Sequence, residues 1–253
     1  MYLENLPSRP KKPRDKGLTM VMDKGLSTQE AQCLMDSSKQ FIDIIKFGFG
    51  TALITDNLKD KIALYKKNDI KIYLGGTLFE AFVVRNQFDK YCDFIKEIGL
   101  DTVEISDGSI KMDHKIKCKY IHTLANKNIT VFSEVGYKSS SQVIPPSKWI
   151  ELMQKELEAG SWKVIAEARE SGNVGLYRSG GEVRSDLIEE ILTQIPKEHI
   201  LWEAPQKQQQ VFFIKLLGSN ANLGNIGTND VIPLECLRLG LRGDTFFNFL
   251  NKS

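Results

Sequence analysis

Cysteine is scarce in this sequence, and its placement excludes two common kinds of scaffold. The 253 residues include four cysteines, Cys33, Cys92, Cys118 and Cys236, which lie far apart and form no CxxC pair. Neither a disulfide framework nor a cysteine-based zinc site is therefore indicated. Reduced thiols of this kind are typical of the cytoplasm, where we expect this protein to be located.

Net charge and long apolar runs are also lacking. The formal net charge is only +2, so the sequence gives no electrostatic reason to expect a nucleic-acid partner. No apolar run is long enough to span a bilayer, and residues 1–5 lack the features of a signal peptide, so we expect no membrane partner. With 42% hydrophobic and 26% charged residues, the composition is that of an ordinary globular protein.

Familiar catalytic and nucleotide-binding motifs are absent from the sequence. The three histidines, His114, His122 and His199, are scattered without the spacing of metal ligands, and no GxSxG, HExxH or P-loop pattern occurs. The first apolar run ends in DKGLS, which is not GxGxxG, and the stretch GFG at 48–50 has no third glycine. These absences argue against a dinucleotide-binding Rossmann domain.

Short apolar runs alternate with helical patterns along almost the whole chain. We predict eight strands, each followed by a helix: Leu18–Asp23, Ile44–Phe49, Ile72–Gly76, Thr102–Ser106, Thr130–Val135, Lys163–Ala168, Ile200–Ala204 and Ala221–Ile226. Eight such units in about 250 residues are the count for a (β/α)₈ barrel, whereas a doubly wound open sheet usually has fewer strands. We therefore expect an α/β protein with a single (β/α)₈ TIM-barrel domain at 17–253. An irregular arm at 1–16 precedes it, and we expect its basic residues to be a solvated tail.

Polar residues gather at the predicted C-terminal ends of the strands, where barrel enzymes place their active sites. These ends carry Asp23, Lys24, Lys46, Glu104, Glu134, Lys138, Glu167, Arg169 and Glu203. Taken singly, each has a structural alternative, such as an ion pair between Glu104 and Lys46 or neutralisation of Asp23 by Lys24. Taken together, they suit an anionic substrate held by Lys and Arg beside a hard cation held by carboxylates.

Glycine-rich stretches near the strand ends are candidates for anion binding. The stretch GGT at 75–77 lets backbone amides approach a ligand, although a tight turn explains it equally well. Two further stretches lie at 170–175, after the sixth strand, and at 218–224, around the eighth. Barrels often bind phosphate in the loops after strands seven and eight, and Gln206 and Lys207 follow the seventh strand.

Several motifs together resemble one protein family. The sequence contains, in this order, KPRDKGLTMVMDKGLS, IIKFGFGTA, YLGGTLFE, VEISDGSI, SEVGYK, IAEARESGNVGLY, LWEAPQKQQQ, NLGNI and GLRGDT. In these it resembles the phosphosulfolactate synthase family over 12–245. The resemblance implies a (β/α)₈ barrel, a homo-oligomer and Mg²⁺-dependent addition of sulfite to C3 of phosphoenolpyruvate, giving (2R)-phospho-3-sulfolactate. In methanogens this reaction opens coenzyme M biosynthesis.

The chemistry implied by the resemblance suggests roles for the polar residues at the strand ends. We expect Lys138, in SEVGYK, to be the general acid that protonates C2. The expected Mg²⁺ ligands are Glu134, Glu167 and Glu203, with Asp23 and Glu104 behind them. The expected binders of the charged substrate groups are Lys24, Lys46 and Arg169. Neutral donors to phosphate are expected from Ser171, Gly172, Gln206, Asn222 and Gly224.

Two other functions stay open at this point. One is a related phosphoenolpyruvate or enolate lyase that uses the same site with another nucleophile. The other is a non-enzymatic barrel protein, because one plant branch of the family is named for its association with heat stress. Sequence motifs alone do not separate these from the sulfite reaction.

Overall fold

The computed structural model describes residues 3–136, 145–168, 175–178 and 180–250, and its centre is a ring of eight strands. The strands are β1 Thr19–Asp23, β2 Ile44–Phe47, β3 Lys71–Leu74, β4 Thr102–Ile105, β5 Thr130–Val135, β6 Lys163–Ala166, β7 Ile200–Glu203 and β8 Leu223–Ile226. The helices are α1 Thr28–Ser38, α2 Leu58–Lys67, α3 Gly76–Val83, α4 Phe88–Glu97, α5 His114–Ala125, α6 Pro146–Glu158, α7 Ser185–Gln194, α8 Lys207–Leu217 and α9 Val231–Arg238. None of these helices is long and apolar enough to cross a membrane.

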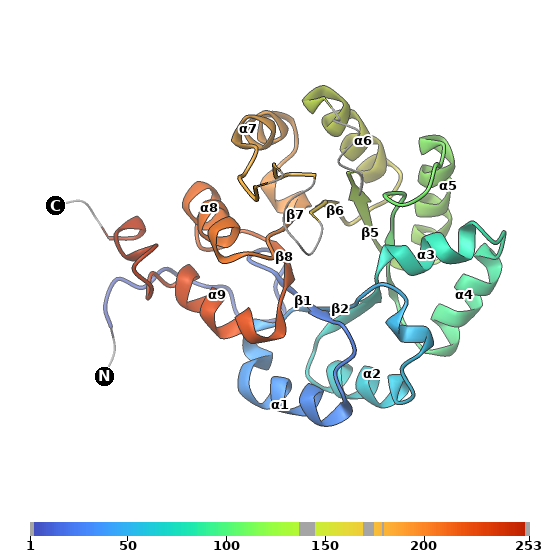
Figure 1. The fold of residues 1–253 in the computed structure, drawn as a ribbon, viewed down its shortest axis with the longest axis horizontal. Coiled ribbons are helices and arrows are strands. Elements are labelled where there is room, and N and C mark those ends of the chain that lie inside the picture. The colour runs from blue at the N-terminus through green and yellow to red at the C-terminus, as the bar shows by residue number, and fades with distance from the viewer. Residues whose placement is uncertain (1–2, 137–144, 169–174, 179, 251–253) are drawn as a thin grey trace.

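The strands form one parallel sheet that nearly closes on itself. Their order is β3-β2-β1-β8-β7-β6-β5-β4, and β3 and β4, at the two ends of this order, lie against each other. The helices form a layer around the outside of the strands (Figure 1). This arrangement is the predicted (β/α)₈ barrel, and each strand overlaps one of the eight predicted runs. The doubly wound alternative is excluded because an open sheet would hold its two edge strands apart.

The core has an inner and an outer part, because side chains alternate between the two faces of each strand. The barrel interior is filled by Leu18, Met20, Met22, Ile44, Tyr73, Phe132, Ile165 and Leu201. Residues between them, such as Val21 and Ile45, face outward and pack in a larger cluster with the helices. Both clusters are almost completely buried, as expected for the centre of a single barrel.

The same alternation turns charged side chains into the mouth of the barrel. Four charged residues each lie two positions after an interior residue. Lys46 follows Ile44, Glu134 follows Phe132, Glu167 follows Ile165, and Glu203 follows Leu201. Because residues i and i+2 of a strand share a face, these four charged side chains lie on the inner side, one layer nearer the C-terminal end. The pattern that packs the core therefore also builds the site.

The N-terminal arm lacks helices and strands over residues 3–16, as predicted. However, Arg9 donates from Nε and Nη2 to the carboxylate of Glu235 at 2.9 and 3.3 Å. Arg14 donates in the same way to Asp43 at 2.8 and 3.0 Å. All four of these side chains are more than nine-tenths buried. The expectation of a solvated basic tail is therefore wrong for these two arginines, whose forked guanidinium groups match carboxylates of the barrel.

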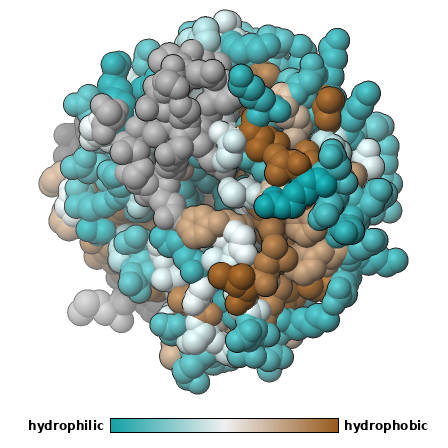
Figure 2. Space-filling model, turned by 45° about the vertical axis from the view of Figure 1, so that its right-hand side comes forward, coloured by the Kyte–Doolittle hydropathy of each residue, from teal (hydrophilic) through white to brown (hydrophobic). Residues whose placement is uncertain are grey.

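Apolar side chains are also found on the surface. Phe49, Leu53 and Ile54, which follow β2, are 45%, 55% and 82% exposed. Figure 2 shows apolar side chains gathered in the middle of one face and surrounded by hydrophilic ones. Gathered apolar surface is typical of contact sites between proteins, so the homo-oligomer stays a prediction with a candidate surface.

Candidate active site at the C-terminal end of the barrel

Lys46, on β2, is a buried cation of the barrel mouth. Its Nζ lies 2.8 Å from Glu104, 3.4 Å from Glu203 and 3.7 Å from Glu134, and its side chain is 9% exposed. Burial disfavours the ammonium form, but the surrounding carboxylates outweigh burial and raise the pKa of Lys46 well above its usual range. Lys46 is therefore a fixed positive charge. The ion pair between Glu104 and Lys46, foreseen as an alternative, is confirmed.

Glu104, on β4, has both carboxylate oxygens engaged within the protein. One oxygen contacts Lys46, and the other accepts a 2.6 Å hydrogen bond from the backbone N–H of Gly76 in the first turn of α3. The partial positive charge of a helix N-terminus favours a carboxylate there. A Cβ atom at residue 76 would lie 2.8 Å from the Glu104 carboxylate and 2.6 Å from Cβ of Ser106, so only glycine fits. Glu104 thus supports Lys46.

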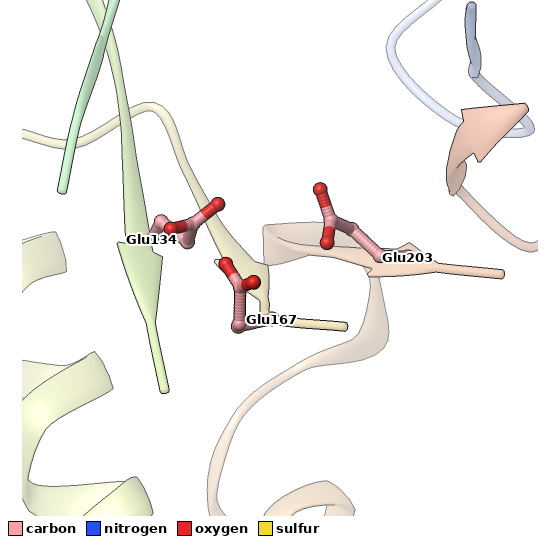
Figure 3. A group of neighbouring side chains, drawn as sticks. All are labelled: Glu134, Glu167 and Glu203. Carbon is pink, nitrogen blue, oxygen red and sulfur yellow. The ribbon is translucent and has the colours of Figure 1, made fainter. Parts of the chain in front are cut away.

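Glu134, Glu167 and Glu203 converge from three neighbouring strands. Figure 3 shows their carboxylates turned toward one another from β5, from the residue after β6, and from the end of β7. One oxygen of each lies within 4.8 Å of the other two, and all three residues are buried. The structure therefore brings together the three glutamates that we expected as Mg²⁺ ligands, and their binding of Mg²⁺ stays a prediction.

Burial and mutual repulsion shape the charge of this cluster. Burial, assisted by the nearby charges of Glu134 and Glu104 and opposed by Lys46, raises the pKa of Glu203 from 4.5 to about 7. One oxygen of Glu203 also accepts a 2.8 Å hydrogen bond from the Ala168 N–H, which favours the ionised form. Three carboxylates this close are a set of hard oxygen donors of the kind that Mg²⁺ and Ca²⁺ prefer.

The backbone around the cluster is held by residues that the sequence patterns did not point to. Lys117 on α5 donates a 2.6 Å hydrogen bond to the carbonyl oxygen of Glu134, and the Tyr177 hydroxyl donates one of 2.5 Å to that of Glu203. Gly136 has a φ of 137°, and a Cβ atom there would lie 2.6 Å from Cβ of Glu167. Only the tertiary contacts show that these residues support the glutamates, since no motif links them to the cluster.

Asp23 does not join the other carboxylates. It points outward from β1, where its carboxylate lies 2.6 Å from Nζ of the buried Lys61 and accepts a 2.8 Å hydrogen bond from the hydroxyl of Tyr65. Its other oxygen accepts the N–H groups of residues 25 and 26, both at 2.9 Å. The expectation of Asp23 as a reserve metal ligand is therefore wrong, because the strand alternation places it on the helix side. Lys61, rather than Lys24, neutralises it.

Lys24 and Gln206 lie at the C-terminal end of the barrel, as expected for substrate binders. Lys24 is exposed and lines a cavity of about 330 Å³ with Ser27, Thr51 and Thr55. Gln206 is the N-cap residue of α8, and its backbone N–H donates a 3.0 Å hydrogen bond to Oε1 of Gln209. The structure leaves their role in substrate binding as a prediction.

Asn222 and Gly224, both expected to bind phosphate, differ in where β8 places them. Asn222 precedes β8, and its side chain accepts the Leu18 N–H and donates to the carbonyl oxygen of Ile200 at the N-terminal end. Gly224 lies within β8, where a Cβ atom would come 2.9 Å from the side chain of Met20. The expectation that Asn222 binds phosphate is therefore wrong in place, because β8 begins only after it, at Leu223. Gly224 pairs with Glu203 of β7, and its role in phosphate binding stays a prediction.

Four other expected site residues, Lys138, Arg169, Ser171 and Gly172, lie outside the described residues. In sequence, Lys138 follows Glu134 by four positions, and Arg169 follows Glu167 by two. Their expected roles stay predictions.

A parallel barrel with buried acidic and basic side chains in its C-terminal mouth defines a member of the (β/α)₈-barrel enzymes, whose active sites are built at that end. The family can also be stated. The model of the family described as (2R)-phospho-3-sulfolactate synthase (ComA) matches residues 7–244. The chain belongs to this family of enzymes, and the resemblance seen in the motifs is confirmed.

Individual relatives agree with this assignment. The chain is 40% identical over 244 residues to phosphosulfolactate synthase of Methanothermobacter thermautotrophicus, covering 94% of this chain and 95% of that protein. It is 41% identical over 248 residues to phosphosulfolactate synthase of Bacillus subtilis, covering 96% and 97%. Among solved structures, 3-hexulose-6-phosphate synthase from Salmonella typhimurium is similar with a TM-score of 0.56 at 16% identity, covering 86% of this chain and 98% of that one. At that identity the structural likeness supports the barrel fold alone.

Proposed function

We propose that this protein adds sulfite to C3 of phosphoenolpyruvate and forms (2R)-phospho-3-sulfolactate, with Mg²⁺ held by Glu134, Glu167 and Glu203. The observation that carries the proposal is the convergence of these three carboxylates in a member of the phosphosulfolactate synthase family. In this reaction the sulfur lone pair of sulfite forms the C–S bond at C3. The π electrons of the double bond move toward C2 and the carboxylate, and C2 then takes up a proton, while the phosphate ester stays intact.

The donor set fits a hard divalent cation. Three buried carboxylate oxygens within 4.8 Å of one another repel when ionised, and a divalent cation among them would relieve that repulsion. When bound, Mg²⁺ would supply Lewis-acid stabilisation of the negative charge that develops on the substrate carboxylate. Glu104 is not part of this set, since the carboxylate oxygens that gather within 4.8 Å come from the other three glutamates, and its closest cation is Lys46 at 2.8 Å.

Lys46 has the properties of an electrostatic residue and not of a proton donor. Its pKa lies well above the usual range, because the carboxylates around it outweigh the effect of burial. A donor that holds its proton so tightly transfers it poorly near neutral pH. Lys46 would therefore attract the anionic substrate and screen the glutamates from one another. The proton at C2 must come from another group, and we assign that role to Lys138.

The remaining charged groups of the substrates require donors around the mouth. Phosphoenolpyruvate and sulfite are both anions, so cations that reach the mouth would bind them. We assign this role to Lys24 and Arg169, and we assign neutral hydrogen bonds to phosphate to Ser171, Gly172 and Gln206. The position of Gln206 as the N-cap of α8 supports the last assignment, because helix N-termini favour anions.

The test is a direct assay of the purified protein with phosphoenolpyruvate, sulfite and Mg²⁺. We expect sulfite-dependent loss of the enol-ether absorbance, no release of phosphate, and a product with the mass of phosphosulfolactate. Substrate consumption without sulfite would instead favour a lyase with another nucleophile. A well-folded protein that makes no product with any divalent metal would contradict the enzymatic proposal.

Variants separate the assigned roles. Lys138→Ala is expected to abolish product formation while Mg²⁺ affinity is kept, and Glu167→Gln is expected to weaken Mg²⁺ binding and activity together. Glu97→Gln is the matched control, because Glu97 is 68% exposed in a surface ion pair with Lys59. If Glu97→Gln and Glu167→Gln bound Mg²⁺ equally well, the assigned ligand set would be wrong.

A further inference from the structure

β8 contains an irregularity close to the three glutamates. In its pairing with β1, Thr19 is opposite Leu223, whereas Val21 is opposite Ile226, so β8 has one more residue than β1 over this stretch. Asn225 lies in this bulge with a φ of 59°. For a residue other than glycine, this left-handed backbone conformation costs free energy, although asparagine adopts it more readily than most other residues. Bulges of this kind redirect a side chain and are frequent beside active sites.

The side chain of Asn225, on β8, reaches past β7 to the residue that follows β6. Nδ2 of Asn225 donates a 3.1 Å hydrogen bond to the carbonyl oxygen of Ala168, which follows β6. β7 lies between β6 and β8 in the sheet, so this hydrogen bond spans the end of β7, where Glu203 is located. Asn225 is 7% exposed, so water competes little for this bond.

Ala168 connects Asn225 to the glutamates. Its backbone N–H donates a 2.8 Å hydrogen bond to the carboxylate of Glu203, while its carbonyl oxygen accepts from Asn225. Ala168 also follows Glu167 directly in the chain. The position of Ala168 therefore affects two of the three glutamates. It affects the Glu203 carboxylate through a hydrogen bond and Glu167 through the covalent backbone.

We propose that Asn225 is a positioning residue for the cation site, which it orders by holding Ala168 and, through Ala168, Glu203 and Glu167. The inference rests on the proposed function, because it concerns the same three glutamates. Groups that orient metal ligands contribute strongly to affinity, since their loss typically costs about 10- to 100-fold. The unfavourable backbone of the bulge is thereby explained, because an unbulged β8 would not aim an amide at Ala168.

The experiment compares two asparagines with the same backbone conformation. Asn225→Gly keeps the left-handed conformation available and removes the side chain that carries the amide. Asn128→Gly is the matched control, since Asn128 also has a φ of 59° and is exposed in the turn between α5 and β5, at the other end of the barrel. Asn225→Asp is a second test variant, because it keeps the shape and replaces the donor with an acceptor that faces the Ala168 carbonyl. Each protein is titrated calorimetrically with Mg²⁺ alone, and then kcat and KM are measured at saturating Mg²⁺.

We expect the Kd for Mg²⁺ to rise about 10-fold or more in Asn225→Gly and Asn225→Asp and to stay unchanged in Asn128→Gly. We also expect kcat to fall more than KM for phosphoenolpyruvate rises, because the defect lies at the cation site. If either folded Asn225 variant binds Mg²⁺ as tightly as the wild-type protein, the inference is overturned and the proposed function stands. If the wild-type protein does not bind Mg²⁺, both are overturned.

Discussion

Replacing Lys46 with methionine tests the electrostatic balance of the barrel mouth. Methionine has a similar length and no charge, so Lys46→Met removes an ammonium group that contacts three buried glutamates. We expect the metal-free variant to be less stable than the wild-type protein at pH 8, because removing one partner of a buried ion pair leaves uncompensated charge. Such removals typically cost about 3–5 kcal/mol.

The cost is expected to depend on pH with a definite sign. The pKa of Glu203 is raised from 4.5 to about 7 in the folded protein, chiefly by burial, so the folded state holds a proton that the unfolded chain has lost between these values. This group therefore stabilises the fold at low pH, and that stability, about 3 kcal/mol, is lost as the pH rises from about 4.5 through 7. Lys46 lowers this pKa, so in Lys46→Met the loss is larger and extends to higher pH.

The assay is urea unfolding in the presence of a chelator at pH 5.5 and pH 8. We expect the deficit of Lys46→Met relative to wild type to be smaller at pH 5.5 than at pH 8, where it reaches about 3–5 kcal/mol. Lys59→Met is the control, since Lys59 forms an ion pair with Glu97 while 69% exposed, and its loss is expected to change stability little at either pH. An equal deficit at both pH values, or none at pH 8, would refute the reasoning.

Three further predictions follow from the same geometry. The affinity for Mg²⁺ is expected to rise with pH up to about 7 and then level off, because Glu203 must lose its proton to bind a cation; a flat calorimetric profile from pH 5.5 to 8.5 would contradict this. Gly136→Ala is expected to cost about 1–3 kcal/mol and most of the activity, since its Cβ would crowd Glu167, whereas Gly243→Ala, with nothing within 4 Å, should change neither. Arg14→Leu is expected to lower stability by about 3–5 kcal/mol in chemical denaturation without changing kcat, because it breaks a buried ion pair at the far end of the barrel; a large fall in kcat of folded protein would argue otherwise.

The fold was predictable from local patterns because a parallel barrel strand is buried on both faces and has a short, continuous apolar signal. Eight such runs, separated by helical patterns, predicted all eight strands. The convergence of Glu134, Glu167 and Glu203 was predictable for a related reason. In a parallel barrel all strands end at the same side, so acidic residues at the ends of consecutive strands meet there.

Other features of the site depend on the face of the strand to which each side chain points. The position of a residue at the end of a strand does not reveal that face. Asp23 and Glu203 both end strands, but Asp23 faces α2 and Glu203 faces the interior. Successive residues of a strand point to opposite faces, so a shift of one position decides whether a side chain faces the helices or the interior. The register with the neighbouring strands sets that position. Asn222 was misplaced for a similar reason, because the start of β8 is set by its register with β1 and β7.

The sequence by itself therefore determined the barrel, the end of the barrel that holds the site, and the three acidic strands that build it. Tertiary structure decided between the alternatives for Glu104, which pairs with Lys46. It alone showed that Lys117 and Tyr177 hold the glutamate backbones and that Asn225 reaches Ala168. The physical reason is the range of the interactions. Periodicity and strand ends are local and repeat along the chain, whereas these contacts join residues 17 to 58 positions apart and form only when separate elements pack together.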